Sequence, residues 1–238
     1  MLLACSLRRL VERFFLDMPC NHFFSALHMR GAKGFRGGTE YSTPAACAPQ
    51  MSEDLLALFR KTGALLDGHF VLRSGLHSRE YFQCALLLQY TDIAAKVCGW
   101  LADKLRDFNC DTVISPALGG IIVGQEVGRS LGKRHIFAEK EEGKLVLRRG
   151  FAISPNERFI VVEDVVTRGG RVQETIDIVR ARGGTVSAVG VIVDRSGANK
   201  PDFGCPFVSL IEMNVETFPG DKLPPDLAEI PAVKPGSK

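Results

Sequence analysis

The chain has 238 residues, of which 45% are hydrophobic and 24% charged, and its formal net charge is +3. This length favours one main folding unit with attachments over two equal domains. The small net charge argues against nucleic acid as a partner, because nucleic-acid-binding domains usually carry a clustered basic face. A local basic pocket for a phosphorylated small molecule is compatible with it.

Cysteine usage and hydropathy narrow the setting in which the chain works. The seven cysteines include no CxxC pair and no Cys/His cluster at zinc spacing, which predicts reduced thiols in a cytoplasmic protein. No apolar run reaches the roughly 18 to 20 residues that a membrane-spanning helix needs, so no membrane contact is expected.

Residues 1–50 differ in character from the rest of the chain. They hold six basic and three acidic residues and end in a stretch rich in glycine and other breakers. Three interpretations compete: a targeting peptide, a poorly ordered extension, or sequence upstream of the true start. The last two are favoured, because a clean amphipathic pattern is missing.

The pattern becomes regular from Met51 onward. Ser52 is predicted to cap a helix whose leucines recur at helical spacing. Residues 69–75 are typical of a strand ending in a turn, and residues 80–84 of its partner strand. Thr91 is predicted to cap a longer helix with one apolar stripe.

Strands and helices alternate beyond residue 111. Strands are predicted at residues 112–115, 135–140, 158–163 and 185–194, and helices at residues 121–131 and 171–182. Residues 144–149 and 151–153 are predicted to pair as a hairpin. This alternation predicts an open α/β sheet whose ligand site lies at the carboxyl ends of the strands. The proline-rich residues 219–238 are predicted to run extended over the surface.

The segment VVEDVVTRGGR, residues 161–171, carries the clearest chemical signal. Glu163 and Asp164 stand where an apolar strand ends, and adjacent carboxylates repel each other unless hydrogen-bond donors or a cation occupy the site. A vicinal diol supplies two such donors. Gly169 and Gly170 let the backbone approach an anion, and the start of the next helix favours a phosphate. The string therefore predicts a ribose 5-phosphate site, against the alternative that it forms only a helix entry and a turn.

VVEDVVTRGGR resembles the diphosphoribosyl-binding signature of the type I phosphoribosyltransferases. Arg168 and Arg171 depart from that signature, because the family more often has small or hydroxylated residues there. Four other segments resemble parts of the orotate phosphoribosyltransferases: the amino-terminal segment GHFVLRSGLHSREYFQC, the pyrophosphate loop VISPALGG, the mobile catalytic loop FAEKEEGK and the orotate-contacting strand end VDRSG. The similarity runs from about residue 51 to about residue 219.

The resemblance implies a type I phosphoribosyltransferase-like fold of the α/β class. Its open, mostly parallel sheet is flanked by helices and joined by a small N-terminal hood. The implied phosphoribosyltransferase domain covers residues 51–218, with the hood at about 51–90 and the core at about 91–218. Residues 1–50 then form an extension and residues 219–238 a tail.

The resemblance also implies a role for individual side chains. Asp164 and the loop residues Lys140 and Lys144 are the implied catalytic residues. Orotate is expected to contact Thr167, Arg195, Tyr81 and Phe82, with the planar guanidinium of Arg195 pairing with its carboxylate. Phosphoribosyl diphosphate is expected to contact Arg73, Leu118, Gly119, Glu163, Asp164, Val165, Val166, Thr167, Arg168, Gly169, Gly170 and Arg171.

The implied activity is that of an orotate phosphoribosyltransferase, a pentosyltransferase of pyrimidine biosynthesis. It would transfer ribose 5-phosphate from phosphoribosyl diphosphate to orotate, with Mg²⁺ as partner of the diphosphate. The family also implies a homodimer in which the mobile loop acts in trans. Two alternatives stay open: a phosphoribosyltransferase for a purine or uracil, and a non-catalytic regulator that senses phosphoribosyl diphosphate. Arg195 argues against the first, because a neutral base offers it no carboxylate.

Overall fold

The structure is a computed structural model that describes residues 48–72 and 75–235. The predictions made for residues 1–47 and for Arg73 lie outside these described residues. Cys84, Cys98, Cys110 and Cys205 are all free thiols. No helix in the described part of the chain is both long enough and apolar enough to cross a membrane.

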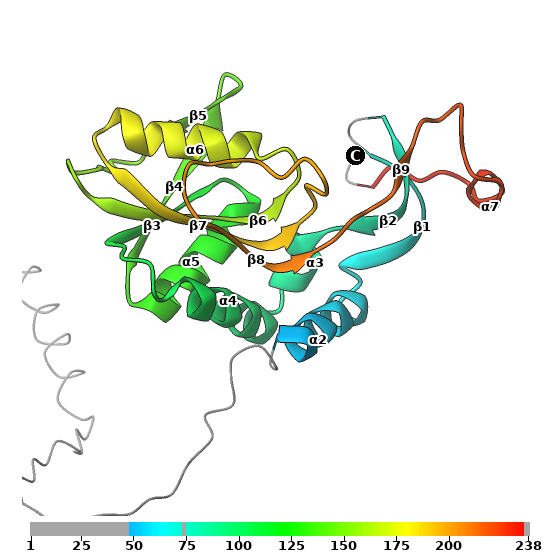
Figure 1. The fold of residues 1–238 in the computed structure, drawn as a ribbon, viewed down its shortest axis with the longest axis horizontal. Coiled ribbons are helices and arrows are strands. Elements are labelled where there is room, and N and C mark those ends of the chain that lie inside the picture. The colour runs from blue at the N-terminus through cyan, green and yellow to red at the C-terminus, as the bar shows by residue number, and fades with distance from the viewer. Residues whose placement is uncertain (1–47, 73–74, 236–238) are drawn as a thin grey trace, which may run out of the picture. The chain divides into compact units, whose positions relative to one another are not determined.

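A six-stranded sheet forms the centre of the fold (Figure 1). Its strand order is β5-β4-β3-β6-β7-β8, and every neighbouring pair is parallel except β4 and β5. The strands are β3 Thr112–Pro116, β4 Arg134–Glu141, β5 Lys144–Leu147, β6 Arg158–Val166, β7 Thr185–Asp194 and β8 Phe207–Glu212. The predicted open, mostly parallel α/β sheet is therefore confirmed.

Helices cover both faces of this sheet (Figure 1). On one face lie α4 (Thr91–Leu105) and α5 (Gly119–Leu131), and on the other lies α6 (Gly170–Ala181). Side chains from successive positions of β6 enter opposite cores: Ile160 joins the core under α4 and α5, and Val161 joins the core under α6. The near-continuous apolar runs of β6 and β7 thus reflect burial on both faces.

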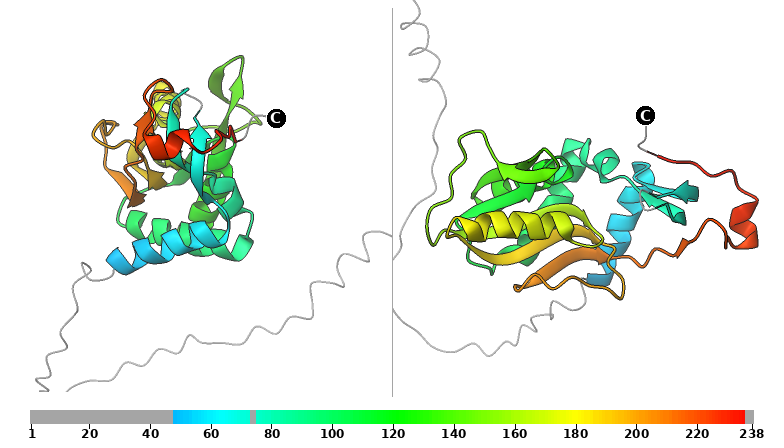
Figure 2. Two further views of the ribbon diagram at one scale, coloured as in Figure 1. Left: turned by 90° about the vertical axis from the view of Figure 1, so that its right-hand side faces the viewer. Right: turned by 90° about the horizontal axis from the view of Figure 1, so that it is seen from above.

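A smaller three-stranded sheet, of order β1-β2-β9, forms the hood. Its strands are β1 Leu65–Val71, β2 His77–Phe82 and β9 Thr217–Phe218, and the helices near it are α2 Ala48–Lys61, α3 Cys84–Leu88 and α7 Pro225–Ala228. The predicted antiparallel pairing of the first two strands is confirmed, with Leu65 opposite Phe82. Figure 2 shows the C-terminal segment returning to this sheet from the far end of the chain.

The predicted hairpin between residues 144–149 and 151–153 is wrong. The strand β5 pairs instead with β4, and residues 151–153 are not in a strand. Glu142 and Gly143, which join β4 and β5, have positive φ values of 48° and 89°. A tight turn with two residues in this region matches the twist of an antiparallel pair, so the charged run folds back on itself.

Two predicted helix caps are displaced along the chain. The first helix begins at Ala48, so Ser52 lies inside it. The N-cap of α4 is Tyr90, and Thr91 is the first helical residue. Alanine and glutamine are good helix formers, which lets the first helix extend upstream of the polar residue expected to start it. The helix Cys84–Leu88 and the edge strand Phe207–Glu212 were not predicted, because both are short and lack clear boundary residues.

The tail is more than an extended surface segment. It contains the short helix α7, whose Leu227 is buried, and its Val233 forms a bridge with Phe70. A proline-rich composition gives no sign of such packing, because the contacts are made with residues far away in the sequence.

Candidate active site

A cavity of about 610 Å³ opens at the carboxyl end of β6. This size suits a small-molecule ligand, and the position is the usual one for ligands of open α/β sheets. Phe82 and every residue from Glu163 to Arg171 line it, so the structure brings these predicted site residues together. The remaining lining residues are Gln83, Cys84, Ala85, Val172 and Glu174.

The two neighbouring acids at this strand end lie in different environments. Glu163 is only 5% exposed, and its Oε2 atom has no hydrogen-bond partner among the described residues. Burial, followed by repulsion from Asp164, raises the pKa of Glu163 to about 9. Asp164 is half-buried, and its Oδ1 accepts a hydrogen bond from the Val165 amide at 2.8 Å. The pair therefore combines a neutral buried acid with a carboxylate at the cavity wall.

The segment expected to bind pyrophosphate packs directly against this acid pair. A Cβ atom on Gly119 would lie 2.5 Å from Oδ2 of Asp164, and one on Gly120 would lie 3.2 Å from Oε1 of Glu163. Arg171 donates from Nη1 to the carbonyl oxygen of Ala117 at 3.3 Å. The glycines thus allow two loops to approach each other, and a side chain at Gly119 would displace Asp164.

Leu118, also predicted to contact the diphosphate, is 80% exposed beside these glycines and does not line the cavity. Its neighbour Gly119 begins α5. This loop therefore offers backbone groups to a ligand more readily than side chains.

The turn into α6 needs a glycine. Gly169 has φ of 75°, and a Cβ atom there would lie 2.9 Å from the ring of Phe203. The helix begins at Gly170, and the first amides of a helix have no partner within it. With the exposed side chains of Arg168 and Arg171 beside them, these amides form a site suited to a phosphate.

Arg195 follows directly after β7 and lies close to the hood. Its backbone N–H donates to the Val166 carbonyl at 2.7 Å, and its guanidinium carbon lies 5.4 Å from the centre of the Phe82 ring. Burial lowers the pKa of Arg195, and its Nε has no partner among the described residues. Arg195 does not itself line the cavity, but it stacks on a residue that does. An unpaired buried guanidinium nitrogen suits a side chain that awaits an anionic ligand.

Three predicted residues do not line the cavity. The hydroxyl of Tyr81 donates to Oε1 of Gln83 at 3.3 Å, so Tyr81 supports a lining residue. Lys140 and Lys144 are exposed on the hairpin formed by β4 and β5. That hairpin is tied to the cavity wall by Glu174, whose carboxylate accepts a hydrogen bond from the Leu145 amide at 3.2 Å.

Sequence reasoning missed Gln83, Cys84, Ala85 and Glu174 as lining residues. The first three follow directly after Tyr81 and Phe82, which was the only signal that could have indicated them. Cys84 is buried, and burial followed by the charge of Asp164 raises its pKa well above the ordinary value. Its thiol is therefore a neutral part of the wall.

Comparison with known proteins agrees with this geometry. The family model of the phosphoribosyl transferase domain matches residues 87–221. An orotate phosphoribosyltransferase of Carboxydothermus hydrogenoformans is 51% identical over 187 residues, which are 78% of this chain and 97% of that protein. One from Desulforamulus reducens is 48% identical over 186 residues, with the same coverage of 78% and 97%.

A solved structure supports the same fold. The crystal structure of orotate phosphoribosyltransferase from Aeropyrum pernix matches with a TM-score of 0.57 and 26% identity, covering 67% of this chain and 93% of that one. The match to the family model and the identity to its curated members place the chain in sequence as well as in fold. The chain belongs to the phosphoribosyltransferase family, in the group of the orotate phosphoribosyltransferases.

Proposed function

We propose that this chain transfers ribose 5-phosphate from phosphoribosyl diphosphate to orotate, giving orotidine 5′-monophosphate and pyrophosphate. The observation that carries the proposal is the cavity in which Glu163, Asp164 and the helix start at Gly170 lie together, with Arg195 stacked against Phe82. The curated relatives of similar length are named for this activity. Their identity to the chain over most of its length supports orotate over a purine as the acceptor.

The reaction needs charge stabilisation more than a covalent nucleophile. The bond from the anomeric carbon to the diphosphate oxygen breaks, and its electron pair leaves with pyrophosphate. A ring nitrogen of orotate then supplies the pair for the new carbon–nitrogen bond. The sugar gains positive character and the leaving group negative charge, so groups fixed beforehand around both contribute most of the rate.

Each wall of the cavity has a part in this scheme. Asp164 and Glu163 accept hydrogen bonds from the ribose hydroxyls, and Glu163, which is protonated in the free enzyme, also has a proton to donate. The amides of the loop from Thr167 to Arg171 bind the 5′-phosphate. Arg195 meets the carboxylate of orotate, and Phe82 covers the ring.

Magnesium is the expected partner of the diphosphate. Among the described residues no group of three or more metal-binding side chains exists, and only the adjacent Glu163 and Asp164 face the cavity as carboxyl groups at the strand end. This donor set fits an ion held mainly by substrate oxygens and water, which is the usual way that enzymes hold magnesium. When bound with the substrate, it would neutralise charge on the diphosphate.

We further propose that the enzyme works as a cytoplasmic homodimer in which the β4–β5 hairpin acts on the neighbouring subunit. Lys140 and Lys144 lie on that hairpin without lining their own cavity, which supports action in trans. Mixing a Lys140→Ala variant with an Asp164→Asn variant tests this. Recovery of activity beyond the sum of the two variants is expected, because one of the mixed sites would contain both intact residues.

A spectrophotometric assay with phosphoribosyl diphosphate and magnesium tests the main proposal. Orotate is compared with adenine, hypoxanthine and uracil at equal concentration. Turnover of orotate alone is the expected result. Turnover of a purine without turnover of orotate would discard the assignment of the base.

A further inference from the structure

The C-terminal segment, residues 216–233, pairs with the β1–β2 hairpin on both of its edges. On one edge β9 pairs with β2 in antiparallel register. On the other, the Val71 amide donates to the carbonyl of Val233, and the Val233 amide donates to the carbonyl of His69, both at 2.8 Å. A two-stranded hairpin is marginally stable by itself in water, so this segment supplies pairing that the hairpin needs.

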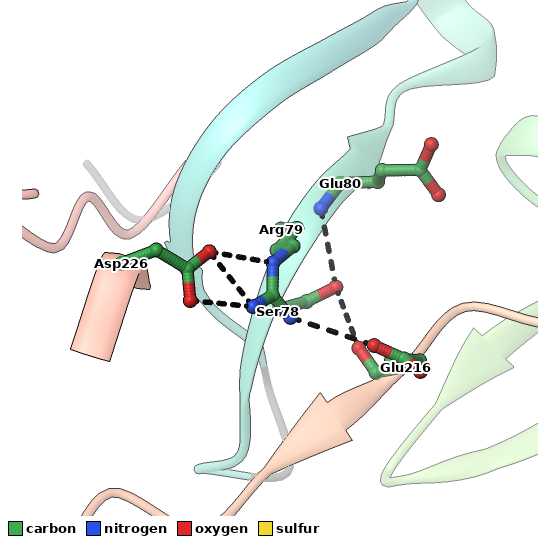
Figure 3. A network of polar contacts seen from close by, with 5 residues as sticks. All are labelled: Ser78, Arg79, Glu80, Glu216 and Asp226. Carbon is green, nitrogen blue, oxygen red and sulfur yellow. Dashed lines mark hydrogen bonds and ion pairs between the residues drawn. The ribbon is translucent and has the colours of Figure 1, made fainter. Parts of the chain in front are cut away.

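One arginine of β2 holds the segment through its side chain (Figure 3). Arg79 donates from Nη2 to Oδ1 of Asp226 at 2.8 Å and from Nε to Oδ2 at 3.1 Å, a two-pronged pairing. It also donates from Nη1 to Glu216 at 3.4 Å, and its guanidinium lies 4.9 Å from the centre of the Phe218 ring. An exposed ion pair contributes little by itself, but paired hydrogen bonds fix the orientation of both partners.

The segment also contributes buried contacts. The hydroxyl of Ser78, which is fully buried, donates to the Glu216 carbonyl at 3.2 Å. His69, only 4% exposed, donates from Nδ1 to the carbonyl of Ile230 at 2.7 Å. Leu227 is 1% exposed. These groups would be left without partners or open to water if the segment detached, so the segment is part of the folded hood.

The strand that this segment holds also carries a wall of the active site. Three positions beyond Arg79, Phe82 lines the cavity and lies under Arg195. From the core side its ring contacts Phe59, with ring centres 5.6 Å apart. Phe82 is therefore held by the core at one end of β2, while residues 216–233 hold the rest of the strand.

We propose that residues 216–233 act as a strap that positions the base-binding wall, with Arg79 and Asp226 as its positioning residues. This inference rests on the proposed transfer to orotate. It assigns to the C-terminal segment a role in affinity for the base, separate from the binding of phosphoribosyl diphosphate at β6. Loss of the strap should therefore raise the KM for orotate more than it changes kcat or the other KM.

The test compares Arg79→Ala, Asp226→Ala and the double variant with the wild-type enzyme. Each single variant should raise the KM for orotate about tenfold, with kcat and the KM for phosphoribosyl diphosphate within about twofold. The double variant should be no worse than either single one, because both remove the same contact. Hydrogen exchange of residues 65–82 should speed up in all three. Arg106→Ala is the control, since Arg106 forms a comparable exposed pair with Asp103 at 2.7 Å on α4.

The outcomes separate this inference from the proposed function. Absence of orotate turnover in the wild-type enzyme would count against the function, and hydrogen exchange would then decide on the strap alone. Normal turnover with unchanged orotate KM and unchanged exchange in Asp226→Ala would overturn the strap. Asp226 has a side chain that is 65% exposed, so this variant can be judged even if Arg79→Ala does not fold.

Discussion

The two walls of the cavity are built in different ways. The acidic wall is one continuous run of residues at the end of β6, a strand that is paired on both sides within the six-stranded sheet. The hood wall stands on a short hairpin whose partners come from distant sequence, such as the Arg79–Asp226 contact across 147 positions. We therefore expect the acidic wall to be rigid and the hood to open locally at lower free energy.

The largest effect is expected from the acidic wall. Asp164→Asn should lower kcat/KM about a hundredfold, because a hydrogen bond to a charged group contributes roughly 1.5–3 kcal/mol. Steady-state kinetics with both substrates checks this. Asp111→Asn is the matched control, since Asp111 pairs with Arg158 where β6 begins, at the opposite end of the strand. Equal losses in the two variants would mean that Asp164 acts only on folding.

A somewhat smaller effect is expected where the two walls meet. Arg195→Ala should raise the KM for orotate about thirtyfold and leave the KM for phosphoribosyl diphosphate unchanged, since the lost contact is with the base. Arg195→Lys should fall between the two enzymes, because lysine keeps the charge but loses the planar fork. An unchanged orotate KM in Arg195→Ala would remove this residue from the site.

A change at the neighbouring loop should act through Asp164. Gly119→Ala would place a methyl group 2.5 Å from Oδ2 of Asp164, so the carboxylate must move. We expect the KM for phosphoribosyl diphosphate to rise about tenfold, as for a loss of roughly 1.4 kcal/mol. Gly99→Ala is the control, because nothing lies within 4 Å of a Cβ atom at Gly99 in α4. Similar kinetics for both variants would show that Asp164 tolerates the displacement.

The buried acid gives a prediction about stability and pH. The pKa of Glu163 is about 9 in the folded enzyme, well above its unfolded value of about 4.3. The folded state thus binds the proton more tightly, and this contribution to stability is complete below about pH 4.3 and is lost progressively as the pH rises through about 9. Glu163→Gln mimics the neutral acid and should remove that dependence. Thermal unfolding of the substrate-free variant at pH 9 should show a Tm higher by about 2–4 °C; a lower Tm at this pH would contradict the protonated state.

The smallest effect is expected from the N-terminal region. All residues that line the cavity lie between Phe82 and Glu174. Deleting residues 1–47, which ends just before α2 begins at Ala48, should leave kcat/KM within about twofold of the full chain. Loss of folded enzyme on this deletion, measured by circular dichroism, would show that the region belongs to the fold.

The acidic wall could be predicted from the sequence because its chemistry is local. An apolar run, two acids and two glycines follow one another, and the alternation of strands and helices placed them at the carboxyl edge of a sheet. The glycines at 119 and 120 were found by family resemblance, and the structure adds the reason for them, which is contact with the acid pair.

The hood could be predicted only in part. The pairing of its two strands follows from their alternating pattern, but the contacts of Arg79 with Asp226 and of His69 with Ile230 join residues far apart in the chain. A proline-rich tail carries no periodic pattern that would indicate them. The turn at Glu142 and Gly143 was missed for a different reason, since a charged run gives no sign that it closes a hairpin.

A crystal structure of the enzyme with phosphoribosyl diphosphate and magnesium tests the central claim most directly. The account predicts that the ribose hydroxyls contact Glu163 and Asp164 and that the 5′-phosphate lies on the amides between Thr167 and Arg171. A sugar phosphate bound away from the end of β6, with these two acids still bare, would contradict it.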